Sequence, residues 1–264
     1  MEVHKPFKTL DEQCEHLKKS KLVNIENSED AKKVLLDANY YNIITCGKVR
    51  FAEDVVNREH IYEKSDFTEW EDYYKNDKAL SNHLRSNVLN FELVLNSRTA
   101  YFISELMETN NSNNNEKESI KQIIKASKNV AGVDYTKYIG YETWTFITKM
   151  TFGDTKKLVF WLLENKFDVY EKVIKGYTFL DVQNVTKAKN RLNELNNLRN
   201  SLFHFTPLSI YLVYGKKIKN KLNNSEKIKV TNWVYRLGGN QRYLNVLDNV
   251  IYHSKRFIKI KNKK

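Results

Sequence analysis

The sequence predicts an all-α protein, a helical bundle preceded by a helical extension. Only eight glycines and two prolines occur in 264 residues, so few positions force the chain to turn. Apolar residues recur at intervals of three and four along most of the chain, which is the spacing of amphipathic helices. A hydrophobic content of 41%, with 12% aromatic residues, is typical of a globular protein with a sizeable core.

The expected extension covers residues 1–77. Its first helix should begin after Thr9, because Thr9 and Glu12 have the spacing of a capping box and apolar residues follow on one face. A second helix should begin near Ser28, which can act as its N-cap. The pattern of residues 51–77 is less regular, and we expect one or two short helices there that lead into the main domain.

Two adjacent tyrosines, Tyr40 and Tyr41, follow the second helix. Two interpretations fit such a pair: burial in the core, or stacking on the bases of an RNA. We expect the core, because aromatic side chains there complete the apolar face of the preceding helix.

The main domain should cover residues 78–264 and open with a long helix from Ser81 to about residue 107. Glu92 lies beside the apolar stripe of this helix, where it either pairs with a buried arginine or is solvated. The polar segment 109–117 is expected to be a surface loop. The helices that follow should bury four aromatic residues: Trp144, Phe146, Phe160 and Trp161.

The stretch from Val182 to Pro207 contains the pattern RN-x-x-x-H, formed by Arg199, Asn200 and His204. Its apolar residues have helical spacing, and at about 100° per residue Arg199 falls inside the apolar stripe. The proline disfavours helical geometry at the residue before it, so the helix should end near residue 205 with His204 in its last turn.

Each of these polar residues has a plain and a functional interpretation. A guanidinium in an apolar stripe is costly unless an anion meets it, and Arg199 either binds such an anion or extends its charged end to solvent. The C-terminus of a helix favours a protonated imidazole, so His204 either transfers protons or only caps the helix. The spacing alone is therefore a weak motif.

The charge of the chain indicates its partners. The net charge of +12 fits a polyanion, of which nucleic acid is the commonest, although such an excess can also only aid solubility. Cys14 and Cys46 lack metal-ligand spacing and are expected to be buried, reduced thiols. No apolar run is long enough to cross a bilayer and no signal peptide is present, so we expect a cytoplasmic protein without a membrane partner.

Common catalytic motifs are absent from the sequence. It contains no glycine-rich phosphate loop, HExxH, paired CxxC or GxSxG. Once these motifs are excluded, the arginine and the histidine of the RN-x-x-x-H pattern are the remaining compact set for acid-base chemistry and anion binding. We expect no cofactor and no metal.

Four segments together resemble a known family. These are RNSLFH at Arg199–His204, FELVLNSRTAYFIS at Phe91–Ser104, the segment ETWTFITKMTFGDTKKL, and the N-terminal KPFKTLDEQCEHLKKSKL followed by ANYYNI. In their order along the chain, these segments resemble the Abi-like proteins of bacterial phage abortive infection, the AbiD and AbiF group, which belong to the HEPN superfamily. The resemblance runs from Lys5 to about Leu208.

The resemblance implies a HEPN-type helical bundle and a metal-independent endoribonuclease that acts as an anti-phage toxin. His204 would be the general acid or base, Arg199 would hold the scissile phosphate, and Asn200 would orient one of them. Attack by the ribose 2′-hydroxyl would leave a 2′,3′-cyclic phosphate. HEPN ribonucleases pair two motifs across a dimer, so a homodimer is expected, with an RNA-bound monomer as the rival arrangement.

This chain departs from the family pattern at two positions. Asn96 stands where a second basic residue is expected, and Phe205 stands where relatives often have a polar residue. A second hypothesis, from a different class, is a non-catalytic RNA-binding module that holds a structured regulatory RNA, with Arg199 serving only to bind phosphate. The two hypotheses combine if a small RNA inhibits the toxin. A third is a helical protein-interaction module without RNA.

Overall fold

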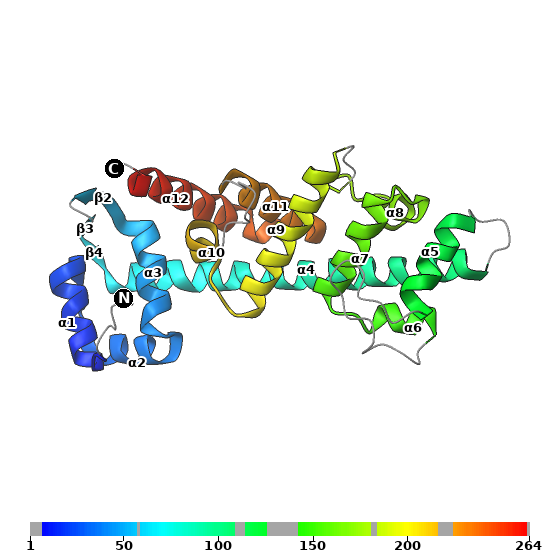
Figure 1. Ribbon diagram of the computed structural model, residues 1–264. Coiled ribbons are helices and arrows are strands. Elements are labelled where there is room, and N and C mark those ends of the chain that lie inside the picture. Colours follow the sequence, from blue (N-terminus) through cyan, green and yellow to red (C-terminus); the bar gives the residue numbers. More distant parts are fainter. Residues whose placement is uncertain are drawn as a thin grey trace. The chain divides into compact units, whose positions relative to one another are not determined.

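The computed structural model describes residues 7–56, 59–108, 114–125, 142–180, 184–215 and 224–262. Within these ranges the chain forms twelve α-helices and four short strands, so the all-α prediction is confirmed (Figure 1). None of the described helices combines the length and the apolar character that crossing a membrane requires. The helices are α1 (Leu10–Lys21), α2 (Ser28–Ala38), α3 (Tyr40–Phe51), α4 (Phe67–Glu108), α5 (Asn114–Lys125), α6 (Thr143–Thr148), α7 (Phe152–Glu164), α8 (Asp168–Ile174), α9 (Val185–Phe203), α10 (Leu208–Tyr214), α11 (Asn224–Gly238) and α12 (Leu244–Asn262).

The chain divides into two compact units. Unit 1 consists of Met1–Arg85, Asn200–Lys216 and Gly238–Lys264, and unit 2 consists of Ser86–Arg199 and Lys217–Leu237. Two of the boundaries fall inside α4 and α9, so each of these two helices contributes residues to both units. The expected division of the chain after residue 77 remains a prediction.

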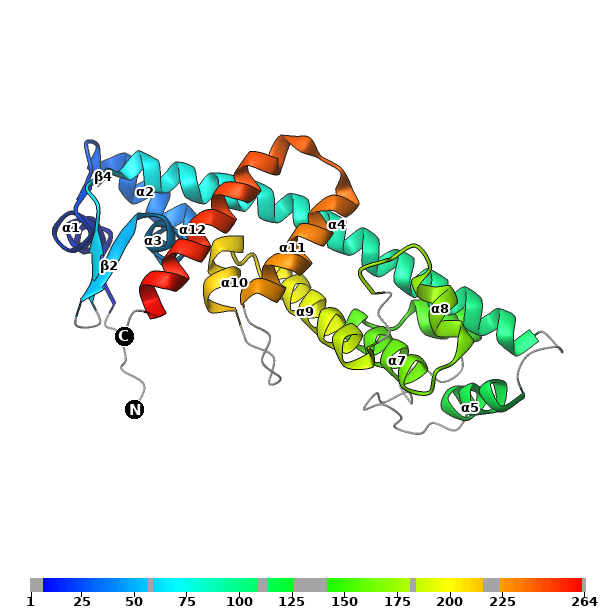
Figure 2. The ribbon, with the colours of Figure 1, turned by 90° about the horizontal axis from the view of Figure 1, so that it is seen from above.

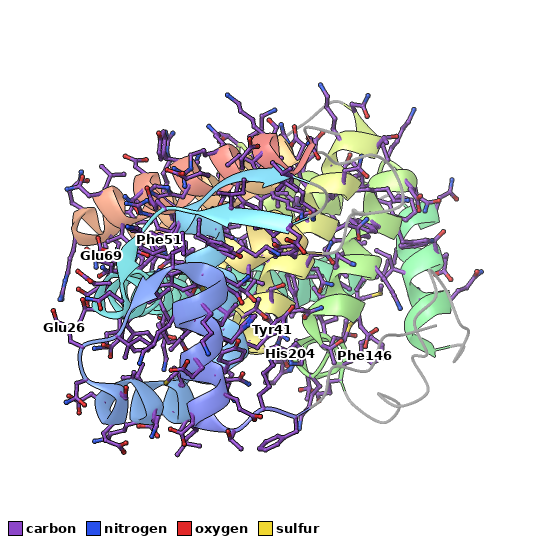
Figure 3. All side chains as sticks on the ribbon, turned by 90° about the vertical axis from the view of Figure 1, so that its left-hand side faces the viewer. Glu26, Tyr41, Phe51, Glu69, Phe146 and His204 are labelled. Carbon is purple, nitrogen blue, oxygen red and sulfur yellow. The ribbon has the colours of Figure 1, made fainter. Side chains whose placement is uncertain are left out.

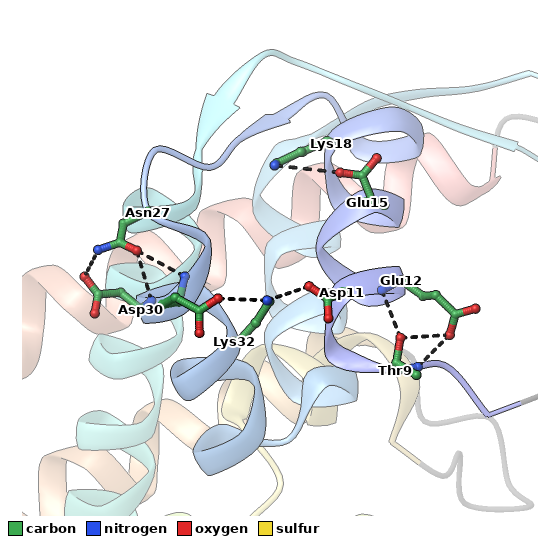
Figure 4. Close-up of polar contacts among 9 residues, drawn as sticks. Thr9, Asp11, Glu12, Glu15, Lys18, Asn27, Asp30 and Lys32 are labelled. Atoms are coloured by element: carbon green, nitrogen blue, oxygen red, sulfur yellow. Dashed lines mark hydrogen bonds and ion pairs between the residues drawn. The ribbon is translucent and has the colours of Figure 1, made fainter.

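Unit 1 begins with two helices whose N-termini are capped by side chains (Figure 4). The capping box of α1 is present as predicted: the Thr9 hydroxyl accepts from the Glu12 amide, and the Glu12 carboxylate accepts from the Thr9 amide at 2.7 Å. Asn27, the residue before Ser28, is the N-cap of α2. Lys32 of α2 lies 2.5 Å from the carboxylate of Asp11 on α1, an ion pair that links the two helices.

The core of unit 1 depends on a close approach between α3 and α4. Gly47 of α3 packs so closely on the indole of Trp70 that a Cβ at this glycine would lie 1.9 Å from the ring, so no larger residue fits. Trp70 is fully buried, donates to the Ser65 hydroxyl at 2.8 Å and stacks on Phe51. This contact fixes α3 against the first turns of α4.

Residues 51–77 do not form the separate short helices that the sequence pattern predicted. Strands β2 (Ala52–Val56) and β3 (Glu59–Tyr62) pair antiparallel, and β1 (Val23–Asn24) pairs in parallel with β4 (Ser65–Asp66). The β-branched residues Val55, Val56 and Ile61 favour strand geometry in the first pair. α4 then begins at Phe67 and not at Ser81, because no glycine or proline interrupts the chain between them.

α10 and α12 complete unit 1 by packing on α3 and on each other, as both ribbon views show (Figures 1 and 2). Arg256 of α12 donates to the carbonyl oxygens of Arg50 and Ala52, which joins α12 to the end of α3. Cys14 and Cys46 are both buried and free, as predicted.

Unit 2 contains the remaining turns of α4 together with α5 to α8 and most of α9 and α11. An aromatic cluster forms around Phe91 of α4, with Phe152, Tyr177 and Trp233 in edge-on contact with its ring. Phe146 is buried as expected, but Trp144 is 55% exposed, so its assignment to the core was wrong. Its indole instead donates to the Glu142 carboxylate just before α6.

Candidate functional site

α9 carries the RN-x-x-x-H residues, and its buried face is the one that the sequence predicted. Leu192, Leu195, Leu198 and Leu202 are completely buried, which accounts for the three-and-four spacing. The helix ends at Phe203, two residues earlier than expected, so His204 follows the last helical residue and does not lie within the final turn.

Arg199 meets an anion within unit 2, the carboxylate of Glu92 on α4. The Arg199 Nε donates to one Glu92 oxygen at 3.1 Å, and Nη2 lies 3.5 Å from the other. The Glu92 side chain is 12% exposed and the Arg199 side chain 29% exposed, so the pair lies at the edge of the core. Of the two possibilities for Glu92, pairing with an arginine is confirmed. The carboxylate offsets the desolvation of the guanidinium and fixes its plane.

In unit 1, a Schellman motif ends α9. The Phe205 amide donates to the Leu202 carbonyl at 3.1 Å and the Thr206 amide donates to the Ser201 carbonyl at 2.9 Å. Phe205 has a φ of 58°, in the left-handed region that a bulky residue rarely adopts. Something must therefore hold the chain in this conformation immediately after His204.

Arg85 of α4 supplies that support. Its Nε donates to the Leu202 carbonyl at 2.9 Å, and its guanidinium lies over the Phe205 ring, 4.4 Å from the centroid. Phe205 is 70% exposed to solvent. A cation on a carbonyl at a helix C-terminus and on an aromatic face is favourable in both contacts. Phe205 thus has a structural partner that a polar residue in its place would lack.

Asn200 and His204 are both exposed to solvent, and Figure 3 labels His204. In the part of unit 1 that the structure describes, Arg85 and the backbone amides of the Schellman motif donate to the Ser201 and Leu202 carbonyls, and the imidazole donates to neither of them. The plain interpretation of His204 as the cap of α9 is therefore not supported.

The family comparison gives the context of these residues. A family model described as "Abi-like protein" matches residues 33–208, which is more than half of the chain. The chain belongs to the Abi-like protein family. Comparison with curated proteins and with solved structures gave no match. The region common to the Abi-like family contains all of α4 and α9, and it ends at Leu208, the first residue of α10.

This last residue of the Abi-like region is fixed by a buried carboxylate. Asp77 of α4 accepts from the Leu208 amide at 2.6 Å and from the Ser209 amide at 2.9 Å, and it caps α10 in this way. Ser81 also accepts from Leu208, at 3.1 Å, and donates to Asp77. Burial raises the pKa of the Asp77 carboxyl, and the hydrogen bonds from Ser209 and Leu208 oppose that shift. The segment that contains His204 is therefore held before it by Arg85, at the Leu202 carbonyl, and after it by Asp77, at the Leu208 amide.

Asp77→Ala should lower the free energy of unfolding by about 3 kcal/mol, because it leaves the buried Ser209 amide without an acceptor and weakens the hold on Leu208. Ser81→Ala is the matched control: it removes one of two acceptors of the Leu208 amide and one donor to Asp77, but it leaves both buried amides with an acceptor and should cost about 1 kcal/mol. Urea unfolding of the three proteins would check this order, and equal losses for both variants would contradict it.

Sequence reasoning missed Arg85 and Asp77, since both lie on α4 more than 100 positions before the residues that they contact. Asn96, the position where a basic residue was expected, lies one turn after Glu92 and is 9% exposed. Its side-chain oxygen is buried and has no hydrogen-bond partner among the described residues. Within those residues no three His, Cys, Asp or Glu side chains come together as possible metal ligands.

Proposed function

We propose that this Abi-like protein is a metal-independent endoribonuclease of the HEPN type that acts as an abortive-infection toxin. The observation that carries the proposal is the solvent-facing His204 at a helix end whose capping is done by other groups. A histidine that the fold does not need for its own stability, held on a segment fixed from two sides, is suited to act on a substrate.

The imidazole of His204 would exchange a proton with the ribose 2′-hydroxyl or with the leaving 5′-oxygen. Imidazole does this near neutral pH, which makes it the commonest general acid-base group. Attack by the 2′-hydroxyl on the adjacent phosphorus forms a 2′,3′-cyclic phosphate and releases a 5′-hydroxyl. DNA lacks this hydroxyl and should stay intact.

Arg199 would bind the phosphate and stabilise the charge that develops on it during cleavage. Glu92 would act as a positioning residue, because it holds the plane of the guanidinium before substrate binds. Asn200, adjacent to Arg199 and exposed, would orient the phosphate or the imidazole.

A homodimer would bring a second motif to the site, so that one histidine serves as the base and the other as the acid. The exposed apolar residues Leu89 and Leu93 on α4 support this part of the proposal. They lie one helical turn apart on the helix that carries Glu92, and an exposed apolar stripe of this kind favours a protein partner.

Incubation of the purified protein with total RNA in EDTA, followed by mapping of fragment ends, tests the proposal. We expect fragments that end in 2′,3′-cyclic phosphate, no effect of EDTA, and intact DNA under the same conditions. Light scattering on the same sample should give twice the 31.3 kDa of one chain.

Other outcomes favour the alternatives. RNA that co-purifies and stays intact would support the RNA-binding module that holds a regulatory RNA, or a toxin inhibited by such an RNA. Cleavage by a monomer would remove the composite site but keep the ribonuclease. The absence of both cleavage and RNA binding would reject the proposal.

A further inference from the structure

A cavity of about 800 Å³ lies in unit 1, bordered by α1, the start of α3, and the ends of β3 and α10. Residues of the RN-x-x-x-H pattern do not line it. Its volume is within the range of about 300–1,000 Å³ of small-molecule sites. We infer that this cavity is a separate binding site for a nucleotide, that is, an aromatic base joined to a phosphate. The inference does not depend on ribonuclease activity.

Flat aromatic surfaces form much of the cavity wall. They come from Phe7, Tyr40, Tyr41, Tyr62 and Tyr214. The prediction that Tyr40 and Tyr41 are core residues was wrong for Tyr41, which is 63% exposed (Figure 3). An exposed tyrosine at the mouth of a cavity offers a face on which a base can stack, as in single-strand binding proteins.

All the charged side chains that line the cavity are basic. Lys8, Lys21 and Lys48 contribute cations, His16 contributes an imidazole, and no carboxylate is among the described lining residues. Burial, together with the charges of Lys8 and Lys21, lowers the pKa of His16. A cavity of this charge favours an anionic ligand, and a phosphate fits it.

One face of α3 brings the two kinds of group together. Tyr41, Ile44, Thr45 and Lys48 follow one another at intervals of three, one and three, so they lie on the same side of the helix. A base on Tyr41 would therefore place its attached phosphate along α3 in the direction of Lys48.

Two buried polar atoms of the lining residues also indicate a ligand. The Tyr62 hydroxyl and the Gln13 side-chain oxygen are buried and have no hydrogen-bond partner among the described residues. Tyr62 is 4% exposed, and burial raises the pKa of its hydroxyl, which therefore stays a neutral donor. Both atoms belong to residues that line the cavity, and a donor and an acceptor of this kind match the edge of a nucleobase better than a purely apolar ligand.

Binding is best measured on full-length protein that carries His204→Ala, so that the RNA stays intact. The probe is fluorescein-labelled hexaadenylate RNA, and its fluorescence anisotropy reports affinity. Tyr41→Ala should weaken binding about tenfold, because it removes one stacking surface. Tyr41→Trp should restore it. Tyr252→Ala is the matched control, since Tyr252 lies on α12 of the same unit and is 62% exposed; it should bind like the parent.

The phosphate part of the site has its own test. Lys48→Ala should reduce the slope of log affinity against log salt by about one, whereas Lys64→Ala, at an exposed lysine outside the cavity, should not. A hexanucleotide backbone without bases should bind the parent as weakly as hexaadenylate binds the Tyr41→Ala variant.

The nucleotide that binds the cavity is either a free nucleotide or an unpaired residue of an RNA chain, and a competition experiment distinguishes the two. Displacement of the probe by millimolar AMP would identify a free-nucleotide site, and displacement by unlabelled hexaadenylate alone would identify a site for an unpaired RNA residue. Equal affinity of the Tyr41→Ala and Tyr252→Ala variants for the labelled hexaadenylate, or no binding of it to the parent protein, would overturn the inference. Because cleavage is measured on protein with an intact His204, either proposal can fail while the other stands.

Discussion

His204→Ala should reduce RNA cleavage by roughly 10²–10⁴-fold, the contribution of a general acid or base. The protein should unfold at the same urea concentration as the wild type, because the imidazole faces solvent and α9 is capped by Arg85 and its own backbone. RNA affinity should change little, since proton transfer contributes to the transition state and not to the bound state. Single-turnover cleavage and anisotropy on the same preparations measure both quantities.

The matched control is His83→Ala, which removes another partly exposed histidine of unit 1 outside the RN-x-x-x-H pattern. It should retain cleavage. If the His204→Ala protein still cleaves RNA at the wild-type rate, the catalytic assignment is wrong. If it loses cleavage and stability together, His204 has a structural role that its exposure does not indicate.

Arg199→Ala should have two effects of different origin. Cleavage should fall by roughly 10²–10³-fold, as expected when one group that stabilises developing charge is removed. The free energy of unfolding should also fall by about 2 kcal/mol, because Glu92 loses its partner while its side chain is 12% exposed. Cleavage assays and urea unfolding would separate the two effects.

A double variant tells whether the loss of cleavage is only a result of instability. Arg199→Met combined with Glu92→Leu replaces the ion pair by apolar side chains, which should restore stability to near the wild-type value. It should remain inactive. Glu92→Gln alone keeps the guanidinium in place and should retain most of the cleavage. Recovery of cleavage in the double variant would show that Arg199 has only a structural role.

Local sequence patterns predicted the features that depend on neighbouring residues. The capping box at Thr9 and Glu12 is present, because both partners lie within one turn. The leucine stripe of α9 is buried, and Glu92, expected beside a buried stripe, does pair with an arginine. Periodicity was less reliable for Trp144 and Tyr41, which have helical spacing but lie exposed. An apolar side chain at the right interval can still lie on an uncovered side of the helix.

By itself, the sequence determined the all-α class, the Abi-like family pattern and the polar set of Arg199, Asn200 and His204, because helical period and motif spacing are local properties of the chain. Only the tertiary structure decided how these residues are held. Arg85 and Asp77 reach the end of α9 and the start of α10 from more than 100 positions away, and the cationic aromatic cavity is lined by residues as far apart as Phe7 and Tyr214. Contacts of this kind form when helices that are distant in the sequence pack together. The periodicity of one helix shows which of its faces is apolar, but it does not identify the helix that packs on that face.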